Sequence, residues 1–575
     1  MPTDEAVKLL LRGYSETNID PYKSQASEII TRLGALALAI DQAASYIQYI
    51  QLPIQRLGEF LLTYETQRAK ILQHTREHFW EYGAIRVVDK AERPQAISAF
   101  TTWEMSFQQL YRNDNKWWEA AAHFLTLSAF LGPTNISESL FRYHWQLEHP
   151  QWMDVFKAST DTDSDNEISS SDEELVEGEP ESSPSGSTTL QEGICQPNTS
   201  ETSRPRWDAD RFWHLINQAY SLSLLQNISR GAGQEETTLA MHPLIRDWLQ
   251  LREKPKQRQT YTREGMDLVA SSIKIYRIIE TTANLKNSLL LHLNACLRND
   301  QQFFRTGHNL GQKVASCTTA TLFQSFYRAM GLFPVSETLA TIIMNTRTKG
   351  LGKKHPDTLT SMVNLASTYQ DQGRWKEAEE LEVQVIETSL KVLGQEHPDT
   401  LTSMNNLAST FWKQGRWKEA EELKVQVMET RKRVLGQEHP STLISMANLA
   451  SIYWDQGRWK EAEELEVQVM ETRKRVLGQE HPDTLTSMNN LAQVLDNQGK
   501  YEQSKKLQVQ VFQMSVRILG PQHPQTLITL KNLLSILVSQ SGEEEALDFV
   551  KHLLDNMGLH ANQSDADSKR PEVSL

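Results

Sequence analysis

Five asparagines recur at a spacing of 42 residues in the C-terminal half of the chain: Asn364, Asn406, Asn448, Asn490 and Asn532. A carboxamide both donates and accepts hydrogen bonds, so a row of them can pair with the main chain of an extended ligand at regular intervals. The same row can instead tie neighbouring structural units together, and both interpretations stay open. Two more asparagines and two tryptophans, whose indoles offer anchor area, are further candidates for one binding groove: Asn405, Asn489, Trp412 and Trp454.

No residue pattern in the sequence is typical of catalysis or metal binding. No nucleophile with a base, no paired catalytic carboxylates and no metal-spaced histidines stand out. The cysteines match no metal or redox spacing: Cys195, Cys296 and Cys317. Histidines recur in His-Pro pairs, but a full repeat separates each from the next, so they are predicted to be structural: His355, His397, His439, His481 and His523. We therefore expect no enzyme activity, no metal ion and no cofactor.

Nucleotide hydrolysis is not expected either. A phosphate-binding loop needs the pattern G-x-x-x-x-G-K-[ST], whose backbone N–H groups and lysine hold the phosphates. The sequence contains no such pattern, and the Gly-Leu-Gly-Lys-Lys run from Gly350 to Lys354 has the wrong spacing.

The His-Pro pairs mark an internal repeat of 42 residues, and the segments 397–438 and 439–480 differ at only about seven positions. Such a period predicts units of one conformation that stack in one way. Within a unit, Pro398 suits the start of a first helix, Gly415 ends it, and Gly436 caps a second helix. We expect an array of about six helical hairpins over residues 313–558, followed by a disordered tail over 559–575.

The hairpin pattern resembles the tetratricopeptide repeat, in the 42-residue form found in kinesin light chains. The motif's leucine, small residue, tyrosine, turn glycine and alanine correspond to Leu407, Ala408, Phe411, Gly415 and Ala420. The resemblance implies an α-solenoid whose inner face, lined by the first helices, binds a protein or an extended peptide; in kinesin light chains an asparagine at the repeated position binds cargo.

Two features of the second helices carry expectations about packing. The usual late aromatic residue is replaced, so we expect looser outer packing at Glu382, Lys424, Glu466 and Gln508. The tryptophans that open these helices are predicted to be packing residues: Trp375, Trp417 and Trp459.

The N-terminal part predicts a small helical domain over residues 1–92. Its segment from Arg32 to Ala43 resembles the Gly-Leu-Pro-Leu-Ala-Ile motif of STAND ATPases, the class that includes NOD-like receptors, with Ala37 in place of the proline. The alternative is a plain buried helix. The resemblance implies the remnant of a nucleotide-binding module, and we expect the chain to begin just downstream of the ATPase core.

Residues 95–252 predict helices followed by a β-hairpin, with β-prone runs at 220–228 and 237–241. This order predicts a winged-helix domain. The segment from Met241 to Trp248 resembles the Met-His-Asp region of the same family, in which the histidine reaches the nucleotide. The resemblance implies a sensor role for His242; satisfying the local backbone is the alternative. Residues 254–312 predict a helical connector.

An acidic insert over residues 158–205 interrupts this domain. It holds twelve acidic residues and no basic residue before Arg204, out of a net charge of −14. Such a composition predicts disorder. Ser171, followed by three acids, is a candidate phosphorylation site, with a passive solvated loop as the alternative.

The remaining charge is near neutral and forms no dense basic patch, so nucleic acid is not an expected partner. No run of eighteen apolar residues and no signal sequence is present, which predicts a cytoplasmic protein without a membrane partner.

The repeat array together with the receptor-like N-terminal segments indicates a non-catalytic scaffold, the sensing or assembly arm of an incomplete NOD-like receptor of the fungal type. A cargo adaptor of the kinesin light chain type is the alternative, although no long N-terminal heptad region is present. The oligomeric state is not encoded in any pattern found here.

Overall fold

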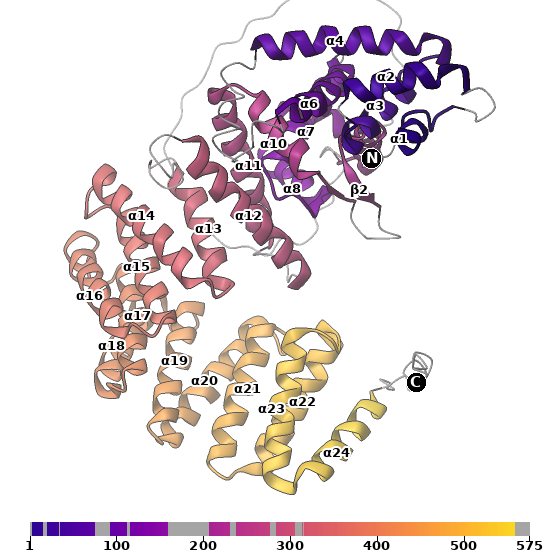
Figure 1. The fold of residues 1–575 in the computed structure, drawn as a ribbon. Helices are drawn as coiled ribbons and strands as arrows, with labels where there is room; N and C mark the ends of the chain where they lie inside the picture. Colours follow the sequence, from indigo (N-terminus) through magenta and orange to yellow (C-terminus); the bar gives the residue numbers. More distant parts are fainter. Residues whose placement is uncertain are drawn as a thin grey trace, which may run out of the picture. The chain divides into compact units, whose positions relative to one another are not determined.

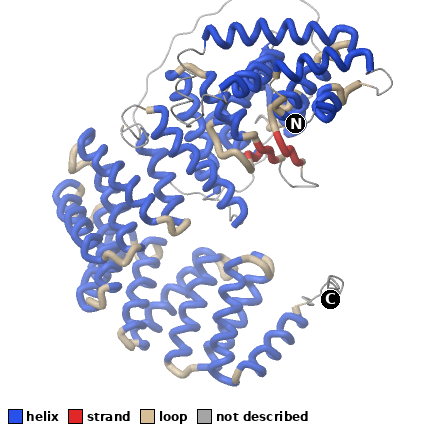
Figure 2. Tube along the Cα trace, viewed as in Figure 1, coloured by secondary structure: helices blue, strands red, loops and turns tan. Residues whose placement is uncertain are grey.

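The computed structural model describes residues 3–14, 20–33, 35–74, 93–111, 116–158, 206–230, 237–276, 283–304, 313 and 316–557. The chain divides into two compact units, residues 1–326 and 327–575. Helices dominate both units, which confirms the predicted all-α class with one small sheet (Figures 1 and 2). Ser171, residues 159–205 of the acidic insert and the predicted tail lie outside the described residues.

The first unit is built mainly of α-helices. They are α1 (Thr3–Leu10), α2 (Lys23–Arg32), α3 (Ala37–Tyr49), α4 (Leu57–His74), α6 (Arg93–Gln108), α7 (Lys116–Ala129), α8 (Glu138–Glu148), α9 (Ala209–Ser221), α10 (Pro243–Arg252), α11 (Pro255–Tyr276), α12 (Ala283–Phe303) and α13 (Cys317–Ala329), which continues into the second unit. Helix α3 packs on α6, and buried Gln42 of α3 donates a hydrogen bond to Ser106 of α6 at 2.8 Å. The helical segment and the segment that follows it therefore share a core.

Three short strands form an antiparallel sheet in the order β1-β3-β2: β1 (Ile136–Ser137), β2 (Gln226–Ser229) and β3 (Thr238–Ala240). The predicted β-prone run at 220–228 is wrong at its start, because Tyr220 lies in α9 and the strand begins at Gln226. Strand β1 was not predicted, because a strand of two residues is too short to show an alternation of apolar and polar residues. The winged-helix assignment stays a prediction.

The two ends of the acidic insert lie together. Lys157 forms an antiparallel bridge with Trp207, and the backbone N–H of Ala158 donates to the carbonyl of Arg206 at 2.8 Å. The segment 159–205 therefore leaves and re-enters the first unit at one place.

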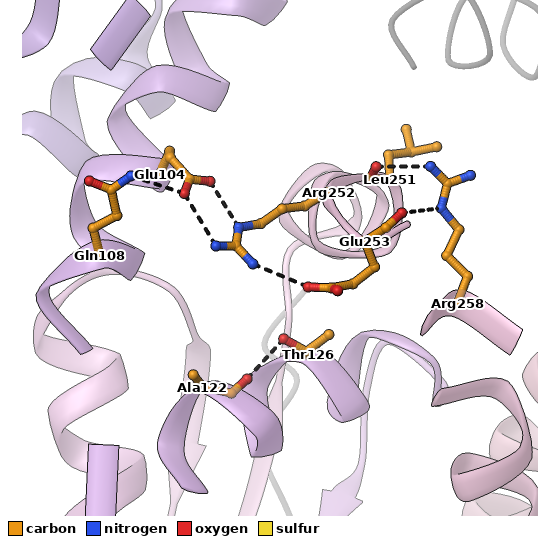
Figure 3. A network of polar contacts seen from close by, with 8 residues as sticks. All are labelled: Glu104, Gln108, Ala122, Thr126, Leu251, Arg252, Glu253 and Arg258. Carbon is orange, nitrogen blue, oxygen red and sulfur yellow. Dashed lines mark hydrogen bonds and ion pairs between the residues drawn. The ribbon is translucent and has the colours of Figure 1, made fainter. Parts of the chain in front are cut away.

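A polar network joins α6 to the end of α10 (Figure 3). The Arg252 guanidinium donates to both carboxylate oxygens of Glu104, at 2.9 and 3.3 Å, and lies over the Phe107 ring. Arg252 Nη1 also donates to the Glu253 carboxylate at 3.1 Å, and Arg258 Nε donates to the Glu253 backbone carbonyl at 2.8 Å. These contacts lie outside the 42-residue repeats, so no equivalent residues recur elsewhere in the sequence.

The second unit contains helices that each pack on the next along the chain (Figure 1). They are α14 (Phe333–Leu351), α15 (Pro356–Asp371), α16 (Trp375–Val392), α17 (Pro398–Lys413), α18 (Trp417–Leu435), α19 (Pro440–Asp455), α20 (Trp459–Leu477), α21 (Pro482–Asn497), α22 (Tyr501–Leu519), α23 (Pro524–Ser541) and α24 (Glu543–Asn556). The 42-residue period thus produces one helical hairpin per repeat.

Each His-Pro pair begins the first helix of a hairpin. The histidine Nδ1 accepts a hydrogen bond from the backbone N–H two residues later, at 3.2 Å for His397 and 3.1 Å for His439. The following proline occupies the first helical position, where an N–H would have no helical partner. The repeated histidines are therefore helix caps.

Small residues and charged pairs fix the stacking of the hairpins. Ala408 and Ala420 are fully buried, so α17 and α18 approach closely. Arg416 then donates to Glu379 of the preceding hairpin at 2.8 Å, and Arg458 repeats this contact with Glu421 at 2.7 Å. The glycine turns between the helices adopt positive φ, +78° at Gly415, a conformation that favours glycine.

Candidate binding face of the repeat array

The five repeated asparagines lie half-buried on the first helices of their hairpins, α15, α17, α19, α21 and α23. We call the surface formed by these helices the first-helix face. Hydrogen bonds between them show that neighbouring first helices lie side by side: Asn532 Nδ2 donates to Asn489 Oδ1 at 2.9 Å, and Trp412 Nε1 donates to Asp455 Oδ2 at 2.6 Å. The predicted groove residues therefore share one surface.

The asparagines of this row have different partners. Asn532 donates to Asn489, and Asn448 donates to Asn405 at the longer distance of 3.4 Å. Asn490 donates to Glu466 at 3.4 Å. In the part of the chain that the structure describes, no hydrogen bond is formed by the side-chain amides of Asn364 and Asn406. Two members of the row thus join neighbouring hairpins, and ligand binding by the others stays a prediction.

For Asn448 and Asn532, the hydrogen-bond partner lies on the first helix of the preceding repeat. The acceptor for Asn448 and Asn532 is an asparagine 43 residues earlier, Asn405 or Asn489. The residue 43 positions before Asn406 is Val363, which offers no side-chain acceptor. Among the described residues, the Asn406 side-chain amide therefore has no hydrogen-bond partner of the kind that Asn448 and Asn532 have.

The expectation of looser packing at the replaced aromatic position is wrong. The side chains at this position of the second helices are buried, with exposed fractions of 5% or less: Glu382, Lys424, Glu466 and Gln508. They face polar groups of the first helices. Lys424 Nζ donates to Asn405 Oδ1 at 2.7 Å, and Gln508 Nε2 donates to Asn489 Oδ1 at 3.1 Å. Hydrogen bonds to the first helices therefore replace the contacts that an aromatic residue makes at this position. The type of residue alone did not predict these bonds.

Burial shifts the pKa of the ionisable members of this set. It raises the pKa of Glu382 and of Glu466 to about 7, and it lowers the pKa of Lys424 to about 8. The cause is the same in each case, because taking a charged group out of water disfavours its charged form. Consecutive hairpins therefore carry buried groups of opposite charge type.

A cavity of about 220 Å³ opens between α17, α19 and α21. Its walls include the two predicted anchor indoles, Trp412 and Trp454, together with Asp455, Glu466 and Asn490. The Trp412 ring is held in place by its hydrogen bond to Asp455, and Lys413 Nζ lies 4.2 Å from its ring centroid. The sequence indicated the indoles and the asparagine; the carboxylates of this cavity were not predicted as site residues.

Two of the tryptophans that open the second helices do not behave as predicted, whereas Trp375 is half-buried. Trp417 is 45% exposed and Trp459 is 39% exposed, so neither is a buried packing residue. A helical side chain covers the turn on the N-terminal side of its own Cα. At the first residue of a helix no such turn exists, and the indole stays partly in solvent.

His242 occupies the same kind of position as the repeated histidines. Its Nδ1 accepts a hydrogen bond from the backbone N–H of Leu244 at 3.1 Å, and Pro243 follows it at the start of α10. Burial lowers the pKa of this imidazole, against the opposing influence of Asp247. The side chain thus caps a helix, in agreement with the local-backbone alternative.

Within the described ranges, no group of three or more His, Cys, Asp or Glu residues is arranged to hold a metal ion. Among the helices of the same ranges, none is long and apolar enough to cross a membrane.

Comparisons with known proteins address the repeats directly. Family models described as tetratricopeptide repeat match residues 358–399, 399–475 and 484–525. A search of curated proteins gave no match. Among solved structures, the chain is similar to the nearly identical TPR-like repeats of a kinesin light chain-like protein from Podosopora anserina, with 32% identity, coverage of 36% of this chain and 97% of that chain, and a TM-score of 0.33.

Two further solved structures share less sequence. BtubC (BKLC) from P. vanneervenii is 19% identical, with 46% of this chain and 94% of that chain covered and a TM-score of 0.34. A signal transduction ATPase with numerous domains that carries a tetratricopeptide repeat sensor, from Pyrococcus horikoshii, is 9% identical, with 97% and 74% covered and a TM-score of 0.34. The family matches and the repeated hairpins show that residues 358–525 of the chain contain tetratricopeptide repeats.

Proposed function

We propose that this chain is a non-catalytic scaffold whose first-helix face binds an extended segment of another protein. Tetratricopeptide repeats generally bind proteins or peptides, and the observation that carries the proposal is the set of free carboxamides on this face. Asn364 and Asn406 each offer a side-chain donor and acceptor that have no partner among the residues described by the structure. A peptide main chain supplies the matching groups at regular spacing.

The partnered asparagines serve a different purpose. Asn532 and Asn489 join neighbouring hairpins through a bond of 2.9 Å. Substitution at Asn532 should therefore lower stability, whereas substitution at Asn364 and Asn406 should lower binding. This contrast separates the two interpretations of the asparagine row within one protein.

The test uses peptides selected from a random phage-displayed library on the full chain. A hydrogen bond contributes about 1 kcal/mol, so Asn364→Ala with Asn406→Ala should weaken the selected peptides about tenfold or more. The thermal midpoint of this double variant should stay within a degree or two of the wild type. Asn532→Ala, at the other end of the array, is the matched control. It should lower the stability of the protein and leave its affinity for the selected peptides unchanged.

The opposite pattern would refute the proposal. If the double variant binds every selected peptide as the wild type does, the first-helix asparagines contribute nothing to a ligand. Selection of no peptide above the background of an uncoated surface would also contradict a peptide-binding role.

We further infer that the scaffold is the sensing or assembly arm of an incomplete NOD-like receptor. The support is the resemblance of residues 32–43 and 241–248 to receptor motifs, in a chain without the phosphate-binding pattern. Calorimetry of the purified chain with ATP, ADP and Mg²⁺ should give no binding heat. Nucleotide binding with micromolar affinity would overturn the remnant assignment.

A further inference from the structure

Two consecutive repeats, 397–438 and 439–480, differ at seven positions. The pairs are Asp399/Ser441, Thr402/Ile444, Asn405/Ala447, Thr410/Ile452, Phe411/Tyr453, Lys413/Asp455 and Lys424/Glu466. The last two pairs reverse a charge. Both acids produced by these reversals, Asp455 and Glu466, line the cavity between α17, α19 and α21. Both positions at which the charge is reversed in the second repeat therefore line one cavity.

Glu466 lines this cavity, and one of its carboxylate oxygens has no hydrogen-bond partner among the described residues. Its side chain is 2% exposed, its Oε1 accepts from Asn490, and its Oε2 has no partner. A buried carboxylate oxygen without a donor is costly, so the site is completed when a donor enters.

The repeat two units earlier shows why Glu466 lacks this donor. Glu382 stands at the equivalent position, and its two oxygens accept from Gln370 at 2.8 Å and from Thr410 at 2.6 Å. The residues that replace these donors around Glu466, 84 positions later, are Trp454 and Val494. Both line the cavity, so the positions that donate hydrogen bonds to Glu382 are occupied around Glu466 by an indole and an isopropyl group.

We propose that this cavity binds one basic side chain, arginine or lysine, of the protein segment that lies on the first-helix face. The faces of Trp412 and Trp454 attract a cation, and the Glu466 carboxylate supplies the missing acceptor for its N–H groups. Asp455 adds a second negative charge beside Trp412. Lys413 Nζ lies 4.2 Å from the Trp412 ring centroid, so an ammonium group of the chain itself already lies over one face of this indole.

The size and position of the cavity favour a side chain over a free small molecule. Its volume of about 220 Å³ is below the roughly 300–1,000 Å³ of typical small-molecule sites. It opens beside Asn490 of the asparagine row, so a residue of a bound extended segment can enter it. This inference rests on the proposed peptide-binding function and adds a side-chain preference to it.

The test uses synthetic pools of acetylated, amidated peptides with random positions and one fixed central residue: arginine, lysine, norleucine or glutamate. Binding to the immobilised full chain is measured by competition. The arginine and lysine pools should bind at least tenfold more tightly than the norleucine pool. The glutamate pool should bind most weakly.

A charge-reversed variant copies the preceding repeat: Ala447→Asn, Asp455→Lys and Glu466→Lys. The preceding repeat accommodates this set, with Lys424 bonded to Asn405, so the fold should tolerate it. The variant should lose the preference for the basic pools and gain affinity for the glutamate pool. Glu466→Gln, an isosteric change, should reduce the basic preference by itself.

Glu382→Gln is the matched control, because Glu382 has both oxygens occupied and no tryptophan at the corresponding wall. It should leave the pool preference unchanged. Choline serves as a free quaternary ammonium; if it binds more tightly than the arginine pool, the ligand is a small cation and the assignment to a peptide side chain is overturned.

The outcomes separate this inference from the proposed function. If all pools bind equally, and Asn364→Ala with Asn406→Ala weakens them together, the peptide-binding face stands and the basic-side-chain cavity is refuted. If no pool binds the wild type, both the function and the inference fail. A wild-type preference for norleucine or glutamate would also overturn the inference.

Discussion

The hairpin of α17 and α18 and the hairpin of α19 and α20 share their cap, their turn glycine and their inter-repeat arginine. His397 and His439 cap the first helices, and Arg416 and Arg458 reach the preceding hairpin. Their differences lie on the first helix, with one exception inside the second helix, Lys424 against Glu466. The helix caps, turn glycines and inter-repeat arginine pairs are thus copied between the two hairpins, while other inter-repeat bonds, such as Trp412 to Asp455, depend on residues that differ.

The largest expected effect concerns Glu466. Burial raises its pKa from 4.5 to about 7, against the opposing influence of Asn490 and Arg473. Between these pH values the folded state holds the proton more tightly than the unfolded chain, so the free energy of unfolding falls as pH rises and stays reduced above about 7. Glu466→Gln should therefore stabilise the protein by up to about 3 kcal/mol at pH 8 and by little at pH 5. Urea unfolding followed by circular dichroism measures both values; equal gains at the two pH values would contradict the buried carboxylate.

Lys424 should respond in the opposite direction. Burial lowers its pKa from 10.5 to about 8. The folded state disfavours the charged form, so the stability cost is present below about pH 8 and disappears as pH rises towards 10.5. Lys424→Met should stabilise the protein by about 2 kcal/mol at pH 7, less than the pKa shift alone implies because its bonds to Asn405 and Ser409 are lost.

The same urea titration, repeated at pH 10, checks this mirror image. The gain from Lys424→Met should shrink there. If the stabilisation by Lys424→Met grows with pH instead, the buried ammonium does not cause it. The two hairpins would then not differ in the sign of their pH dependence.

A smaller loss of stability is expected from removing the histidine helix caps, which the two hairpins share. His397→Ala and His439→Ala each remove one helix cap, and a lost cap costs about 1 kcal/mol. Because both caps have the same geometry, the two variants should lose stability equally in urea unfolding. A clear difference between them would show that the seven substitutions also alter the scaffold.

The periodic sequence predicted the hairpins because its signals are local. A His-Pro cap, a turn glycine and paired alanines each act within a few residues, and identical neighbours stack alike. The burial of Glu382, Lys424, Glu466 and Gln508 was missed because their partners lie on other helices. The partners of Asn448 and Asn532 were also missed, because each lies 43 positions earlier, on the first helix of the preceding repeat. Strand β1 was missed because its two residues are paired only through β3.

Photo-crosslinking tests the central claim, that ligands bind the first-helix face, most directly. A benzoylphenylalanine residue replaces Gln493, an exposed residue of α21 at the rim of the cavity, or Lys460, an exposed residue of α20. With the arginine-fixed peptide pool, irradiation should give a covalent adduct at position 493 and none above background at position 460. Adducts of equal yield at both positions, or an adduct at position 460 alone, would contradict the account.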